Sequence, residues 1–116
     1  MQNSIDFWAA LDALAAQSEI IIDRPKGTAH PRYAHLIYPV HYGYLKNTSS
    51  MDGGGIDVWV GSDPAGTICG IICTIDLIKR DSEIKILIGC TEEEKQKVLK
   101  LHNETEFMKG LFIPRR

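Results

Sequence analysis

Apolar residues near the start of the chain recur at helical spacing. Phe7, Leu11 and Leu14 lie three or four residues apart, and Ser4 precedes them as a residue type that caps helices. This pattern predicts an amphipathic helix over about residues 5–17, with its apolar side packed across a sheet.

The middle of the chain alternates between β-branched or aromatic runs and clusters of turn residues. The first run, Glu19 to Arg24, contains three consecutive isoleucines and ends at Pro25, which cannot donate to a β-ladder. An irregular surface segment is predicted from Lys26 to Ile37, where glycine and proline interrupt every pattern. Further extended segments are predicted at residues 38–45, 56–60, 67–78 and 84–89, the last two forming a hairpin.

A second helix is predicted near the end of the chain. Thr91 and Glu94 have the spacing of a capping box, and an apolar stripe follows over residues 92–104. Several short strands in hairpin-like order, with a helix at each end, favour a mainly β domain with flanking helices (α+β). We expect a small OB-like β-barrel of about five to six strands, because closure removes exposed strand edges.

Composition narrows the class of protein. A chain of 116 residues is long enough for one domain, which we place over residues 1–116. The formal net charge of −2 gives no general attraction to nucleic acid, so no nucleic-acid partner is expected. The sequence has no apolar run of the roughly 18 to 20 residues that a membrane span needs, and no signal-peptide pattern. We therefore expect a cytoplasmic protein without a membrane partner.

Acidic residues supply the candidate chemistry. Asp52 lies on a glycine-rich loop and Asp57 enters the next strand five residues later, so the two carboxylates can converge on one ion. Magnesium prefers oxygen ligands and commonly shares a few carboxylates with a substrate phosphate. The spacing thus indicates a magnesium site, although a lone turn aspartate or strand-start aspartate is ordinary in many proteins.

Further candidates lie on both sides of this pair. Asp81, Glu83 and Lys85 alternate onto one strand face if the strand begins there, with Asp76 before the turn; they could equally be a solvated hairpin turn. Other residues with suitable chemistry are Asp23 as an acid at a strand end, and Arg32 and Tyr42 as donors to phosphoryl oxygens.

The order of these residues resembles the magnesium-dependent, barrel-fold soluble inorganic pyrophosphatases. The segment Tyr38-Pro-Val-His-Tyr42-Gly-Tyr44 matches the tyrosine segment of that family, and Asp52 and Asp57 match the outer acids of its Asp-x-Asp-Pro-x-Asp signature. The resemblance covers about residues 19–89. Gly54 replaces the middle acid, which is the family's proposed base, and the segment between Tyr33 and Tyr38 is about fifteen residues shorter than in the family.

The resemblance implies hydrolysis of pyrophosphate to two phosphates, with Mg²⁺ as cofactor and Mn²⁺ as a substitute. It implies catalytic roles for Asp57, Lys85 and Tyr42, and substrate binding by Arg32, Tyr42 and Lys85. The implied metal ligands are Asp23, Asp52, Asp57, Asp76, Asp81 and Glu83. The expected partner is a small phosphoanhydride, and we expect a homo-oligomer. Two alternatives stay open: a nucleotide or sugar diphosphate as substrate, and a non-catalytic relative that binds phosphate or a partner protein.

Overall fold

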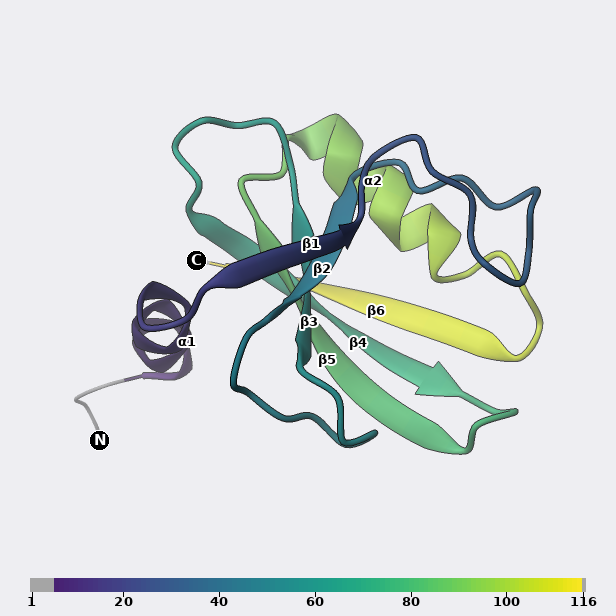
Figure 1. Ribbon diagram of the computed structural model, residues 1–116, viewed down its shortest axis with the longest axis horizontal. Coiled ribbons are helices and arrows are strands. Elements are labelled where there is room, and N and C mark those ends of the chain that lie inside the picture. Colours follow the sequence, from purple (N-terminus) through teal and green to yellow (C-terminus); the bar gives the residue numbers. More distant parts are fainter. Residues whose placement is uncertain (1–5, 116) are drawn as a thin grey trace.

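The computed structural model describes residues 6–115, which form one six-stranded sheet and two helices (Figure 1). The elements, in chain order, are α1 (Phe7–Ala16), β1 (Ile20–Arg24), β2 (His41–Leu45), β3 (Ile56–Val60), β4 (Ile68–Asp76), β5 (Asp81–Ile88), α2 (Glu92–Leu101) and β6 (Met108–Pro114). The expected mainly β architecture with flanking helices is confirmed. The helix expected at residues 5–17 begins at Phe7, because the carboxylate of Asp6 accepts the Ala9 amide. Ser4, the expected cap, lies outside the described residues.

The strand order is β1-β2-β3-β5-β4-β6, with β1 and β6 at the edges. The sheet is therefore open, and the barrel description holds only approximately. Neighbouring strands are antiparallel except β3 and β5, which run parallel with Trp59 opposite Leu87. The strands thus do not follow one another only as hairpins, because β4 lies on the far side of β5 from β3.

Strand β6 is absent from the sequence-based expectation, which ended the ordered elements at the second helix. Gly110 and Pro114 punctuate this segment, and both residue types are depleted in strands. On an edge strand a proline is tolerated, because the side that faces solvent needs no donor. The side-chain amide of Asn103 binds both the N–H and the C=O of Gly110, at 3.2 and 3.0 Å.

The β4–β5 hairpin turns more tightly than its sequence indicates. A turn was expected over residues 79–83, but β5 already begins at Asp81. Asp76 accepts hydrogen bonds from the amides of Ile78 and Lys79, at 2.9 and 3.0 Å, and Arg80 adopts a left-handed φ of 59°. These interactions close the turn early, which places Glu83 and Lys85 inside the sheet.

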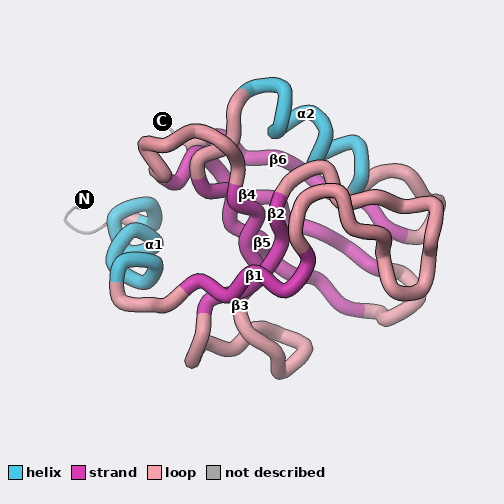
Figure 2. Tube along the Cα trace, turned by 45° about the horizontal axis from the view of Figure 1, so that its top comes forward, coloured by secondary structure: helices cyan, strands magenta, loops and turns pink. Residues whose placement is uncertain are grey.

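The two helices cover different faces of the sheet (Figures 1 and 2). Side chains on one face pack with α2 into a core cluster of Tyr38, Val40, Trp59, Ile72, Leu87, Cys90 and Val98. The opposite face packs against α1 through Leu45, Val58, Ile68, Ile86 and Ile88. We call these the α2 face and the α1 face.

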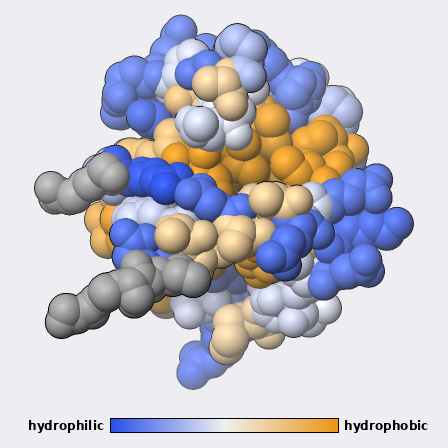
Figure 3. Space-filling view, turned by 90° about the vertical axis from the view of Figure 1, so that its left-hand side faces the viewer, coloured by the Kyte–Doolittle hydropathy of each residue, from blue (hydrophilic) through white to orange (hydrophobic). Residues whose placement is uncertain are grey.

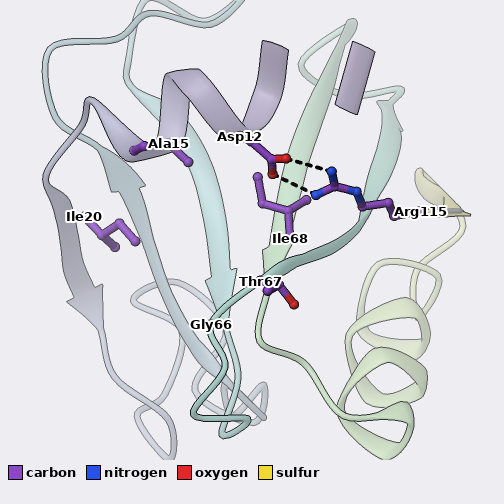
Figure 4. A pocket seen from close by; sticks show the side chains of 8 residues that line it. Asp12, Ala15, Ile20, Gly66, Thr67, Ile68 and Arg115 are labelled. Carbon is purple, nitrogen blue, oxygen red and sulfur yellow. Dashed lines mark hydrogen bonds and ion pairs between the residues drawn. The ribbon is translucent and has the colours of Figure 1, made fainter. Parts of the chain in front are cut away.

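Two side-chain networks fix the helices in place. Asp12 of α1 forms a bidentate ion pair with Arg115, with both distances 2.7 Å, above Ile68 (Figure 4). At the start of α2 the expected capping box between Thr91 and Glu94 is present.

Among residues 6–115 there is no helix with the length and apolar character needed to cross a membrane.

Candidate functional site

A buried lysine is the centre of a polar cluster on the α2 face. Lys85 Nζ donates to Tyr42 Oη at 2.8 Å, to Asp57 Oδ2 at 2.7 Å and to Glu83 Oε1 at 3.0 Å. The Lys85 side chain is 7% exposed, and those of Asp57 and Glu83 are 23% and 12% exposed. The ammonium group thus links three strands through charge-assisted hydrogen bonds in a site with little solvent.

Strand register explains why these side chains meet. Tyr42 lies opposite Trp59, and Asp57 shares its face of β3 because it is two residues away. The parallel pairing of β3 with β5 brings Glu83 and Lys85 of β5 beside them. Residues from β2, β3 and β5 therefore converge, although up to 43 positions separate them in the sequence.

Asp52 approaches the same cluster from the glycine-rich loop. Its Oδ1 accepts the Gly54 amide at 2.9 Å and the Ser50 hydroxyl at 2.8 Å. These bonds, together with a contact to Glu83, lower the pKa of Asp52 to about 2. Burial raises the pKa of Glu83, an effect that Lys85 partly offsets. The carboxyl groups of Asp52 and Glu83 also interact with each other, which lowers the pKa of Asp52 and raises that of Glu83.

Two other polar groups of the cluster, Tyr42 and Lys85, also have a shifted pKa. Burial raises the pKa of Tyr42, whose hydroxyl therefore stays protonated at neutral pH. Burial lowers the pKa of Lys85, but its contacts with Tyr42 and Asp57 outweigh that effect and raise the pKa overall. The site therefore combines a permanent cation and a hydroxyl donor with three carboxylates.

The other predicted site residues lie apart from these contacts. Asp76 is buried and holds the hairpin turn, and it is paired in register with Asp81 at the end of the same face. Asp23 is exposed at the bulge between Ile22 and Arg24. Arg32 is exposed on the loop that precedes β2. Glu83 contacts Lys85, whereas no described contact joins Asp81 to the cluster.

The resemblance implies magnesium as the cofactor, so the carboxylate oxygens of the site should match the ligands that Mg²⁺ prefers. Among residues 6–115, no three His, Cys, Asp or Glu side chains are arranged to hold a metal by themselves. However, Glu83 Oε2 is buried without a hydrogen-bond partner, and the carboxyl beside it belongs to Asp52. Two ionised carboxylates in contact need a shared proton or a cation. Because Mg²⁺ is usually bound by one or two carboxylates plus water and phosphate, Asp52 and Glu83 fit it.

Comparison with known proteins leaves the family undetermined and the fold clear. No protein-family model and no curated protein sequence matches this chain. Among solved structures, the chain is similar to an inorganic pyrophosphatase from Coxiella burnetii, with a TM-score of 0.60 and 15% sequence identity. The alignment covers 82% of this chain and 84% of that chain. The fold is pyrophosphatase-like.

Two residues beside the cluster were not foreseen from the sequence. In this pyrophosphatase-like fold, Arg24 donates to the hydroxyl of Tyr38, whose ring stacks on Tyr42 at 5.5 Å. His102 is 4% exposed and accepts a 3.2 Å hydrogen bond from Trp59 through Nε2. The position of Arg24 at a strand end was a weak signal for a site residue. His102 gave none, since its burial depends on how α2 lies on the sheet.

Proposed function

We propose that this protein hydrolyses inorganic pyrophosphate with Mg²⁺ as cofactor. The observation that supports the proposal is the cluster in which Lys85 contacts Tyr42, Asp57 and Glu83, on a fold similar to that of an inorganic pyrophosphatase. A cation, a neutral hydroxyl and carboxylates in one buried site can bind a phosphoanhydride and its metal together. Positioning and electrostatic stabilisation are the main requirements of phosphoryl transfer.

Each residue has a distinct role in this proposal. The Lys85 ammonium attracts phosphoryl oxygens by its charge, Tyr42 donates its hydroxyl to one of them, and Asp57 orients the ammonium group of Lys85. Asp52 and Glu83 hold the metal, which when bound neutralises phosphate charge and lowers the pKa of a water molecule. The roles of Asp57, Asp76, Asp81 and Asp23 as metal ligands, and of Arg32 as a donor to phosphate, which the sequence also suggested, remain predictions.

Gly54 takes the position of the middle acid, which the resemblance makes the general base, so the site lacks that carboxylate. Gly54 is exposed, and a Cβ added there would lie 3.3 Å from Asp52 Oδ1, so an aspartate at this position would add charge beside Asp52. General-base catalysis typically contributes about 10²- to 10⁴-fold in rate. We therefore expect turnover that is slower than a complete site would give, and a gain in the Gly54→Asp variant.

The test is phosphate release from pyrophosphate by the purified protein, with excess Mg²⁺ and with chelator. We expect metal-dependent release, and we expect Asp52→Asn to raise the Mg²⁺ concentration for half-maximal rate by at least about tenfold. The matched control is Asp63→Asn, which neutralises an acid in the Gly61–Gly66 turn. Calorimetric titration with Mg²⁺ measures the same loss of affinity independently of turnover. No phosphate release from a folded protein that still binds phosphate would indicate the non-catalytic alternative.

A nucleotide or sugar diphosphate is the second candidate substrate. Exposed Tyr33 lies against His30, with ring centroids 5.0 Å apart, and His30 in turn stacks on Tyr38 at 6.1 Å. These rings form an aromatic surface that extends from Tyr42 toward solvent, where a planar organic group can stack. Comparing pyrophosphate with ADP and with a sugar diphosphate as substrates decides between the two candidates, because turnover of pyrophosphate alone would exclude the second.

A further inference from the structure

Two cysteines on the α2 face lie close together where β4 begins and β5 ends. Cys69 is the extra residue of a β-bulge, because the pairing of β4 with β5 passes from Ile68 to Gly70 over a single step of β5. Its Sγ lies 3.4 Å from the carbonyl oxygen of Leu87. Cys69 is half-buried and packs against the core cluster of the α2 face, so the bulge directs this thiol to that face.

Cys90 approaches Cys69 from the segment that links β5 to α2. Gly89 before it adopts a left-handed φ of 60°, so the chain turns sharply at the end of β5. Cys90 Sγ lies 3.8 Å from the carbonyl oxygen of Ile88 and 4.0 Å from that of Trp59. Cys90 is 5% exposed and belongs to the core cluster against which Cys69 packs. The two thiols therefore share one environment but differ in their access to solvent.

The two thiols also differ in their ionisation. They interact with each other, and this contact lowers the pKa of Cys69 to about 6, against the effect of burial and with a contribution from the charge of Lys95. The same contact, together with burial, raises the pKa of Cys90. The pair thus keeps its proton on the buried sulfur. The half-buried sulfur of Cys69 is left as the thiolate, which is the reactive form of cysteine.

Cys69 lies on the side of the molecule that carries α1 and the end of β6 (Figure 1), and its carbonyl oxygen accepts the Arg115 amide at 3.0 Å. Figure 3, the view from this side, shows apolar side chains gathered between hydrophilic margins. An uncharged molecule approaches such a surface without the desolvation penalty of an ion. Hydrogen peroxide is small and uncharged, and it oxidises accessible thiolates.

We propose that Cys69 and Cys90 form a reversible disulfide when the protein meets a hydroperoxide. The Cys69 thiolate attacks an oxygen of hydrogen peroxide, so that an S–O bond forms, the O–O bond breaks and hydroxide leaves. The sulfur is thereby oxidised to a sulfenic acid, and the peroxide is reduced. The Cys90 sulfur then attacks the Cys69 sulfur: an S–S bond forms, the S–O bond breaks, and the departing hydroxide takes up the Cys90 proton as water. In total, two thiols and one hydrogen peroxide give one disulfide and two water molecules.

Cys73 provides an internal comparison. It is also half-buried, but it is paired in register with Ile84 and Leu111, with which it lines a hollow on the α1 face. We therefore expect Cys73 to stay a thiol while the other two cysteines are joined. The proposal does not rest on the proposed hydrolysis of pyrophosphate, because no residue that contacts Lys85 takes part in it.

The test treats the purified, reduced chain with a small excess of hydrogen peroxide, alkylates the remaining thiols and measures the intact mass and the peptide map. We expect the wild type to lose two hydrogen atoms and to keep one alkylatable thiol, at Cys73. Dithiothreitol should restore all three thiols. We expect Cys69 to react at least about tenfold faster than Cys73. The matched control is Cys73→Ser, which should form the same disulfide at the same rate.

Two further variants separate the roles of the paired thiols. Cys69→Ser should show no loss of hydrogen atoms, because it lacks the attacking thiolate. In Cys90→Ala the sulfenic acid of Cys69 should accumulate and be trapped by dimedone, because no second thiol resolves it. Circular dichroism verifies that both variants fold.

Several results would overturn the proposal. A wild-type chain that keeps three alkylatable thiols under conditions that oxidise free cysteine would do so. A disulfide that includes Cys73, or one that joins two chains in place of the internal one, would do so as well, as would dimedone labelling of Cys73 ahead of Cys69. These results come from the wild type alone, so they decide the question even if substitution of buried Cys90 prevents folding.

Discussion

His102 should make the protein markedly less stable in mild acid. Burial, with a smaller contribution from Lys85, lowers the pKa of His102 to about 3 from its ordinary 6.5. Its Nε2 accepts the Trp59 hydrogen bond, so the neutral ring carries its proton on Nδ1, which is buried without a partner. Protonation would add a buried charge beside Lys85. The folded state therefore keeps this imidazole neutral at pH values where the unfolded chain protonates it.

The magnitude follows from the two pKa values. Between about pH 6.5 and 3 the unfolded state binds one proton more than the folded state, so the unfolding free energy falls as the pH falls. The slope is about 1.4 kcal/mol per pH unit. Between pH 7 and pH 5, His102 alone accounts for a loss of about 2 kcal/mol, and its stabilising contribution is fully present only above the unfolded pKa.

Urea denaturation at pH 7, 6 and 5 measures this contribution when the wild type is compared with His102→Gln. Glutamine stays uncharged and retains an acceptor for Trp59, while all other titrations are common to both proteins. We expect the variant to lose about 2 kcal/mol less than the wild type over this range. His35→Gln, at an exposed position, is the control. Parallel pH profiles for the wild type and His102→Gln would refute the reasoning.

Two further predictions concern the sheet. Lys85→Met leaves Asp57 and Glu83 as uncompensated, largely buried acids, so we expect a loss of about 3–5 kcal/mol at pH 7 in urea denaturation. A loss below about 1 kcal/mol would show that water replaces the ammonium group. Gly43→Ala places a Cβ 1.8 Å from the Ile21 carbonyl oxygen, so β1 must move away from β2. We expect about 3 kcal/mol of destabilisation and faster amide exchange in β1, and unchanged exchange there would contradict the predicted clash.

Local patterns predicted most of the sheet, because strand chemistry is a local property. The strand at Ile56–Val60 has the predicted bounds, and the Thr91–Glu94 capping box is where its spacing indicated. What failed depends on tertiary structure: β6 forms because β4 offers its edge, although Gly110 and Pro114 interrupt the local pattern. Whether the sheet closes cannot be read locally, since closure depends on the angle between distant strands.

Part of the candidate site was predictable for a related reason. Alternation along β5 places Glu83 and Lys85 on one face, and the glycine-rich loop delivers Asp52 near the same end of the sheet. The parallel contact between β3 and β5, which brings Asp57 to Lys85, is a long-range pairing that no local pattern specifies. Arg24 lies beside the cluster because of its place in β1.

The side-chain amide of Asn103 limits how copies of this protein can assemble. By binding both polar groups of the Gly110 backbone, it fills hydrogen-bonding positions that a strand from another chain would use. The next outward-facing N–H belongs to Phe112, and the one after it would belong to Pro114, which has none. Pairing of another strand with β6 is therefore interrupted at Gly110 and at Pro114, and we expect open-ended polymers and strand exchange to be disfavoured at this edge.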